Sequence, residues 1–207
     1  MTANIIGPRE LLRTDGMDAV IARLAETDYI VQRPLVASFE NALRLGKPLL
    51  VDGAPGVGKT ALAEALADAF HLPLFHLQGV EDLTLEDVLA RWDHEAQNQW
   101  KIETLAIAKA SGEHFDLMEV LGKARAEVWT KEFLILGEVA AAYEYSATTG
   151  KDCVLLVDEA DKLQRKIHNM MLGVFARGVT RIPRYEGRIG TLDQTRWPIV
   201  IVTLNAE

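Results

Sequence analysis

The chain has 207 residues, 49% of them hydrophobic, so it can bury one substantial core and is most simply a single α/β domain. Its formal net charge of −8 argues against a large non-specific nucleic-acid surface, because binding to a phosphate backbone needs accumulated Lys and Arg. The single cysteine, Cys153, excludes a disulfide framework within the chain, and no apolar run approaches the roughly 20 residues that span a bilayer.

The amino terminus predicts an unexported protein. It carries charged residues such as Arg9, Glu10 and Arg13 and has no apolar leader segment. Cys153 begins an apolar run and is expected to be a small buried thiol. These features together predict residence in the cytoplasm.

Two segments with helical periodicity come first, at residues 17–26 and 34–45, and Gly46 is positioned to end the second helix. Residues 1–30 are therefore expected to form an N-terminal helical segment. Residues 31–207 are expected to form the main domain.

The most informative stretch is GAPGVGKT at residues 53–60, which follows the apolar residues 48–51 and precedes the alanine-rich residues 61–70. This order predicts a strand, a glycine loop and a helix. Such a loop directs backbone N–H groups at a phosphate chain, above the positive end of the helix dipole. We therefore predict an ATP site in which Lys59 contacts the β and γ phosphates, as a catalytic group, and the Thr60 hydroxyl binds Mg²⁺. The expected nucleotide contacts are Gly53, Ala54, Pro55, Gly56, Val57, Gly58, Lys59, Thr60 and Ala61.

A second short strand is predicted at residues 74–77, after a break at residues 71–73. Thr84 with Asp87 then resembles the start of a helix. Residues 84–129 are predicted to be an insertion between core strands.

The insertion contains helix-like pieces at residues 101–110 and 117–128. Two of its aromatic residues, Trp92 and Trp100, are candidates for base stacking. We expect them to be packing anchors instead, because no basic residues surround them.

The remaining elements alternate between helix and strand. Residues 132–145 and 167–175 are predicted to be helical, and residues 154–157 form a continuous apolar run typical of a parallel strand covered on both faces. Residues 199–204 are predicted to be a last buried strand. The alternation indicates an α/β fold.

Two adjacent carboxylates, Asp158 and Glu159, follow the apolar strand at residues 154–157. The carboxyl ends of strands are the edge of an open α/β sheet where ligands collect. The pattern looks like a Walker B motif, in which Asp158 would hold Mg²⁺ and Glu159 would polarise the water that attacks the γ-phosphate. Asn205 follows the last strand and is predicted to orient that water as a third catalytic group.

Two further groups of residues are ambiguous. The basic residues of one stretch are either solvated charges or a subunit or substrate contact: Arg177, Arg181, Arg184 and Arg188. The five histidines lack close metal-ligand spacing, so no zinc site is expected: His71, His76, His94, His114 and His168.

The series GAPGVGKT, LLVDEAD and IVIVTLN resembles the large nucleotide-binding subdomain of AAA+ ATPases, with Asn205 similar to their sensor 1 residue. More narrowly, ARWDHEAQNQWKI, TKEFLILGE and FARGVTRIP resemble the MoxR branch, and the similarity runs from about residue 30 to the end. The resemblance implies a P-loop NTPase fold, a three-layer αβα sandwich around a mainly parallel sheet. It also implies ATP and Mg²⁺ as ligands.

The resemblance further implies ring assembly, commonly as a hexamer, and ATP-driven remodelling of protein partners. A von Willebrand factor A domain protein is a frequent partner of this branch, in metalloenzyme maturation or complex assembly. Family members continue past the sensor residue into an arginine finger and a helical lid with a sensor 2 arginine, whereas this sequence stops at Glu207. Either this sequence is a fragment or the remainder lies elsewhere, and we expect poor turnover from this segment alone.

Three alternatives remain open at the level of sequence. The DEAD letters at residues 158–161 suggest a nucleic-acid motor, although the Ser-Ala-Thr tripeptide at residues 146–148 lies before them rather than after, and the net charge is unfavourable. A nucleotide-gated assembly module with little turnover would use the same loop. So would a small-molecule kinase, although the acidic pair and Asn205 suit water activation better.

Overall fold

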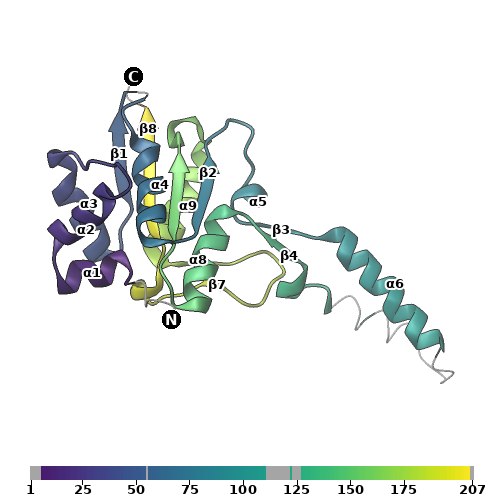
Figure 1. Ribbon diagram of the computed structural model, residues 1–207. Coiled ribbons are helices and arrows are strands. Elements are labelled where there is room, and N and C mark those ends of the chain that lie inside the picture. Colours follow the sequence, from purple (N-terminus) through teal and green to yellow (C-terminus); the bar gives the residue numbers. More distant parts are fainter. Residues whose placement is uncertain (1–5, 55, 111–121, 123–126, 206–207) are drawn as a thin grey trace.

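The structure is a computed structural model that describes residues 6–54, 56–110, 122 and 127–205. Its centre is a four-stranded sheet in which every neighbouring pair of strands is parallel (Figure 1). In spatial order the strands are β1 (Leu49–Gly53), β8 (Ile199–Asn205), β5 (Val154–Asp158) and β2 (Leu74–Gln78). The predicted α/β fold with a parallel central sheet is therefore confirmed.

The two central strands are buried on both faces, and their side chains alternate between two cores. Val154 and Leu156 of β5 belong to one hydrophobic cluster, whereas Leu155 and Val157 belong to another. In β8, Ile201 faces the first cluster and Val200 the second. This period of two explains why a continuous apolar run, rather than an alternating one, marks a strand covered by helices on both sides.

Helices cover both faces of the sheet and complete the three layers. The first cluster contains residues of α1 (Pro8–Thr14), α2 (Met17–Ala25), α3 (Arg33–Leu45) and α4 (Lys59–Phe70). The second contains residues of α5 (Leu85–Val88), α8 (Glu138–Thr149) and α9 (Arg165–Arg177). Short 3₁₀ turns are η1 (Lys131–Phe133), η2 (Ala160–Lys162) and η3 (Gln194–Arg196). No helix in the described part of the chain is long and apolar enough to cross a bilayer.

Most predicted element starts and stops agree with the structure. Gly46 ends α3 in the left-handed conformation, and Thr84 with Asp87 forms a reciprocal capping box at α5. Cys153 is fully buried, and burial raises the pKa of its thiol to about 11. The predicted buried thiol is therefore confirmed.

The prediction of one helix over residues 132–145 is wrong in its first part. The segment contains η1 and a short strand, β4 (Leu134–Leu136), which pairs antiparallel with β3 (Ala90–Trp92), and α8 begins only at Glu138. Gly137 separates the two elements and lies against the backbone of α5, where an added Cβ would be 2.1 Å from the backbone oxygen of Asp87. Periodicity alone missed the strand because its pairing partner lies more than 40 residues earlier.

Within the predicted insertion, α6 (His94–Ala110) projects away from the body of the molecule (Figure 1). Trp92 packs edge-on against Trp129 with centroids 4.9 Å apart, and its indole N–H donates to the Pro183 oxygen at 3.1 Å. Trp100 packs against Phe133. Both tryptophans therefore make the packing contacts expected of them. The predicted helix at residues 117–128 lies mostly outside the described residues.

The basic stretch runs through a small hairpin of β6 (Val179–Thr180) and β7 (Ile189–Gly190). All four of its arginines are exposed. The Arg184 guanidinium stacks over the Trp129 ring at 4.4 Å from the centroid, a favourable cation–π contact. One of the four thus links the hairpin to Trp129, which also packs against Trp92.

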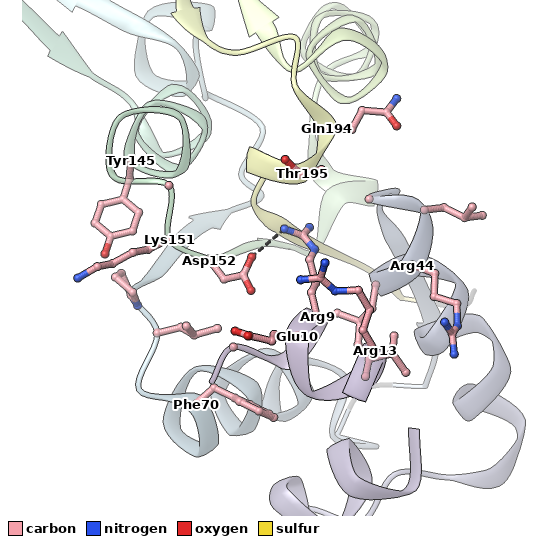
Figure 2. A pocket seen from close by; sticks show the side chains of 18 of the residues that line it. Arg9, Glu10, Arg13, Arg44, Phe70, Tyr145, Lys151, Asp152, Gln194 and Thr195 are labelled. Carbon is pink, nitrogen blue, oxygen red and sulfur yellow. Dashed lines mark hydrogen bonds and ion pairs between the residues drawn. The ribbon is translucent and has the colours of Figure 1, made fainter. Parts of the chain in front are cut away.

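Arg9 ties the N-terminal helices to the starts of the two central strands. Its guanidinium pairs with Asp152, next to β5, at 2.9 Å (Figure 2) and donates to the backbone oxygens of Trp197 and Pro198, which precede β8, at 2.6 and 3.2 Å. Burial raises the pKa of Asp152, and the charge of Arg9 opposes that rise. Without Arg9, an unpaired carboxylate would remain in a mostly dry site.

We therefore expect Arg9→Met to destabilise the fold. Both side chains keep some exposure, 14% and 17%, so the loss should be about 2 kcal/mol rather than the roughly 3–5 kcal/mol of a fully buried pair. The loss of stability should become smaller as the pH falls, because burial raises the pKa of Asp152 and protonation removes the unpaired charge. Urea unfolding measures both effects.

Arg44→Met is the matched control for this test. Arg44 pairs with Glu40 at 2.8 Å on the exposed face of α3, so its loss should change stability by less than about 0.5 kcal/mol. Equal losses in the two variants would contradict the role assigned to Arg9.

Candidate functional site

The glycine loop connects the end of β1 to the start of α4, as the sequence predicts. Gly56 and Gly58 have φ angles of 80° and 88°, a backbone conformation that favours glycine. Gly58 is the residue before α4, so the loop lies at the positive end of that helix. Of the other predicted contacts, Gly53 ends β1, Ala54 and Val57 lie exposed in the loop, Ala61 lies in the first turn of α4, and Pro55 is outside the described residues.

Lys59 is buried, although it carries a charge. Its ammonium group donates three hydrogen bonds: to the Gly53 oxygen at 2.6 Å, to the Ala54 oxygen at 3.1 Å and to Asn205 Oδ1 at 2.9 Å. An ammonium group has three donors, so all of them are used. The lysine is thereby held beneath the glycine loop and against the end of β8.

Asp158 ends β5 and meets the first turn of α4. The Thr60 hydroxyl donates to Asp158 Oδ2 at 3.0 Å, across 98 residues of sequence. A carboxylate beside a hydroxyl offers the oxygen ligands that Mg²⁺ prefers, and Mg²⁺ commonly takes only one or two protein ligands together with phosphate oxygens. These two residues therefore fit the predicted magnesium site.

Glu159 has a φ of 50°, which is left-handed and costs a non-glycine residue of order 1–3 kcal/mol. Its carboxylate accepts from Asn205 Nδ2 at 3.2 Å on one oxygen. The other oxygen accepts from Gln78 Nε2 at 2.8 Å and from Lys162 Nζ at 2.6 Å. The Glu159 carboxylate thus lies at the carboxyl ends of the strands, in contact with the last residues of β8 and β2.

Asn205 lies between the two predicted motifs. Its amide oxygen accepts from Lys59, its amide nitrogen donates to Glu159, and its backbone N–H donates to Asp161 Oδ1 at 3.0 Å. The structure therefore brings the glycine loop, the acidic pair and the predicted sensor together in one hydrogen-bonded group.

Four residues that hydrogen-bond to the predicted site residues were not predicted from the sequence: Gln78, Asp161, Lys162 and Thr203. Gln78 is the polar residue that ends the second strand, and Thr203 is the only hydroxyl residue in the run at 199–204. A polar residue in such a position is a weak indication of a functional site. Lys162 donates to Glu159, and this hydrogen bond, together with the nearby carboxylates, raises the pKa of the Lys162 amine.

The histidines were the other residue type considered as metal ligands. In the described ranges no three His, Cys, Asp or Glu side chains gather where they could hold a metal. His76 lies 3.8 Å from Asp158 Oδ2, His168 contacts the Ala160 oxygen at 2.7 Å, and His114 is outside those ranges.

A cavity of about 1120 Å³ lies at the opposite edge of the sheet, beside the amino ends of the strands (Figure 2). Its lining includes Arg9, Arg13 and Lys151, and none of the predicted site residues. This cavity is therefore separate from the predicted ATP site, which is defined by the geometry of the glycine loop and by the polar groups that converge there.

The fold and this edge define the class of P-loop nucleotide-binding proteins. The family model of the AAA domain, dynein-related subfamily, matches residues 48–206. The chain therefore belongs to the AAA domain family.

Individual relatives match shorter segments. A 70-residue segment is 37% identical to the ATP-dependent zinc metalloprotease FtsH of Pseudothermotoga lettingae and covers 34% of this chain and 11% of the relative. A 67-residue segment is 40% identical to the Replication factor C large subunit of Sulfurisphaera tokodaii and covers 30% and 15%. The matched segments thus span less than a sixth of the length of these curated relatives.

A solved structure of a candidate ATPase from Cytophaga hutchinsonii is similar over 91% of this chain and 43% of its own. The TM-score is 0.49 and the sequence identity 15%.

The close approach of Gly79 to the acidic pair generates a prediction. A Cβ there would lie 2.1 Å from the backbone oxygen of Glu159 and 2.8 Å from that of Asp158. Gly79→Ala should therefore lower the free energy of unfolding by roughly 1–3 kcal/mol through overpacking. Gly173→Ala in α9 meets no atom within 4 Å and should stabilise by roughly 0.5–1 kcal/mol. Thermal unfolding compares them, and a Gly79→Ala variant as stable as wild type would refute the packing argument.

Proposed function

We propose that the chain is the ATP-binding and hydrolysing part of an AAA+ ATPase of the MoxR type, which remodels or assembles protein partners. One observation carries the proposal. Lys59, Thr60, Asp158, Glu159 and Asn205 are joined by direct hydrogen bonds at one sheet edge. Their residue types match the needs of phosphate binding, metal binding and water activation.

The glycine loop and Lys59 would bind the triphosphate. Backbone N–H groups of the loop and the amino end of α4 supply positive potential, and Lys59 adds a full charge close to the β and γ phosphates. Because Lys59 now contacts Asn205 and two loop oxygens, phosphate oxygens would replace some of these acceptors. We propose residues 53–61, the glycine loop and the start of the following helix, as the nucleotide contacts.

Thr60 and Asp158 would hold Mg²⁺. The metal, when bound, neutralises charge that develops on the phosphate oxygens. Thr60 contributes a hydroxyl oxygen and Asp158 a carboxylate oxygen, and the hydrogen bond between them keeps both at the mouth of the loop.

Glu159 would accept a proton from the attacking water, and Asn205 would orient that water. The amide of Asn205 contacts both Glu159 and Lys59, so it lies between the proposed base and the group that binds the γ-phosphate. A base and an orienting amide in direct contact suit hydrolysis better than transfer to a second substrate.

The branch and the partners rest on sequence resemblance. The MoxR-like segments support ring assembly, commonly hexameric, and a von Willebrand factor A domain partner. We keep the division into residues 1–30 and 31–207, and the insertion at 84–129, as proposals within this assignment. The cytoplasmic location also stays a prediction.

Two substitutions test the proposed roles. Glu159→Gln should keep ATP affinity within about threefold while lowering turnover by roughly 10²–10⁴-fold, because it removes only the proton acceptor. Lys59→Ala should weaken ATP binding itself, because it removes the charge beneath the loop. Titration calorimetry and phosphate release, measured over a range of protein concentrations, separate the two effects.

Unchanged turnover in Glu159→Gln would contradict the assignment of the base. Nucleotide-dependent assembly without phosphate release in the wild type would support the assembly module instead. Stimulation of turnover by single-stranded nucleic acid would support a nucleic-acid motor, and a phosphorylated small-molecule acceptor would support a kinase.

A further inference from the structure

Thr203 places a hydroxyl in the interior of β8. Its side chain is fully buried, and the four residues before it in the strand are aliphatic. A hydroxyl without a partner is costly in such a place. The partners of Thr203 therefore indicate what the hydroxyl does.

Both partners belong to the acidic pair at the end of β5. The Thr203 hydroxyl donates to Asp158 Oδ1 and accepts from the backbone N–H of Glu159 at 2.9 Å. One side chain on β8 thus contacts both acidic residues directly.

These contacts begin where the backbone pairing stops. The last paired residues of β5 and β8 are Val157 and Val202. On its other side Thr203 is aligned with Val51 of β1. The Thr203 side chain therefore extends the link between β8 and β5 by one residue, at the level where β5 becomes the acidic turn.

The first consequence is that the two oxygens of Asp158 have different surroundings. Oδ1 accepts from Thr203, and the Glu159 N–H lies 3.2 Å from it. Oδ2 accepts from the Thr60 hydroxyl at 3.0 Å. Because Thr203 holds Oδ1 inside the fold, Oδ2 is the oxygen presented to the glycine loop.

The second consequence concerns the direction of Glu159. Its left-handed backbone is held at the N–H by Thr203, while Gly79 lies against its backbone oxygen. Its carboxylate then reaches Asn205. Loss of the Thr203 hydroxyl would release the N–H and the Oδ1 atom at the same time.

We propose that Thr203 is a positioning residue that presents Asp158 Oδ2 to the nucleotide-bound magnesium and fixes the orientation of Glu159. The inference rests on the proposed function, because it assumes that Mg²⁺ and a nucleotide bind at this edge. It adds a role on β8 that none of the motif residues supplies.

The test measures how strongly Mg²⁺ tightens nucleotide binding. The chain is titrated with the non-hydrolysable analogue AMPPNP in excess Mg²⁺ and again in EDTA. For Thr203→Val we expect the dissociation constant in Mg²⁺ to rise about tenfold, the lower end of the range for groups that orient metal ligands. The constant in EDTA should stay within about twofold, since the glycine loop and Lys59 are untouched.

Turnover supplies a second readout. The Mg²⁺ concentration for half-maximal ATP hydrolysis should rise by a similar factor in Thr203→Val, and kcat should fall more than the KM for ATP changes. Thr203→Ser keeps the hydroxyl and should restore the wild-type Mg²⁺ dependence in both measurements.

Ser146→Ala is the matched control. Ser146 is also fully buried, and its hydroxyl donates to the Lys151 oxygen at 2.9 Å, away from the acidic pair. Loss of this hydroxyl tests a general effect of removing a buried hydrogen bond. Its Mg²⁺ dependence should equal that of wild type.

Several outcomes would overturn the inference. They are an unchanged Mg²⁺ effect in folded Thr203→Val, an equal loss in Ser146→Ala, a loss in Thr203→Ser, or wild-type binding that Mg²⁺ does not tighten. If Thr203→Val does not fold, Thr203→Ala is judged by the same criterion. Wild-type protein that binds AMPPNP under neither condition would instead reject the proposed function.

Discussion

The position of β8 between β1 and β5 is the constraint on which the site depends. All four strands of the sheet are parallel, so their carboxyl ends lie at one edge. The register aligns Gly53 with Asn205 and Gln78 with Asp158. The end of β8 therefore lies between the glycine loop and the acidic pair, and its last residue, Asn205, contacts Lys59 on one side and Glu159 on the other.

The polar groups at this edge hold one another in place. Lys59 is buried with three acceptors, and Glu159 accepts from three side chains. No buried side-chain nitrogen or oxygen in the described ranges lacks a hydrogen-bond partner. A satisfied network of this kind fixes orientations that isolated side chains would not keep, because leaving a buried polar group unpaired is costly.

At the amino ends of the strands, Arg9 holds the two central strands, β5 and β8, in place. Arg9 contacts Asp152 before β5 and two backbone oxygens before β8. The N-terminal helices also share a hydrophobic cluster with α4, the helix that follows the glycine loop. The helices that precede the family match are therefore part of the structure that positions the strands of the proposed site.

The sequence by itself determined the local elements and the types of residue at the site. GAPGVGKT predicted a glycine loop between strand and helix, and the apolar runs predicted parallel strands buried on both faces, because these features depend on neighbouring residues. The prediction from sequence was wrong at residues 134–136, where a short apolar run forms a strand only through pairing with β3. The tertiary structure alone decided the strand order, the left-handed turn at Glu159 and the contacts of Gln78 and Thr203. These depend on pairing between segments tens of residues apart in the chain, which no local pattern encodes.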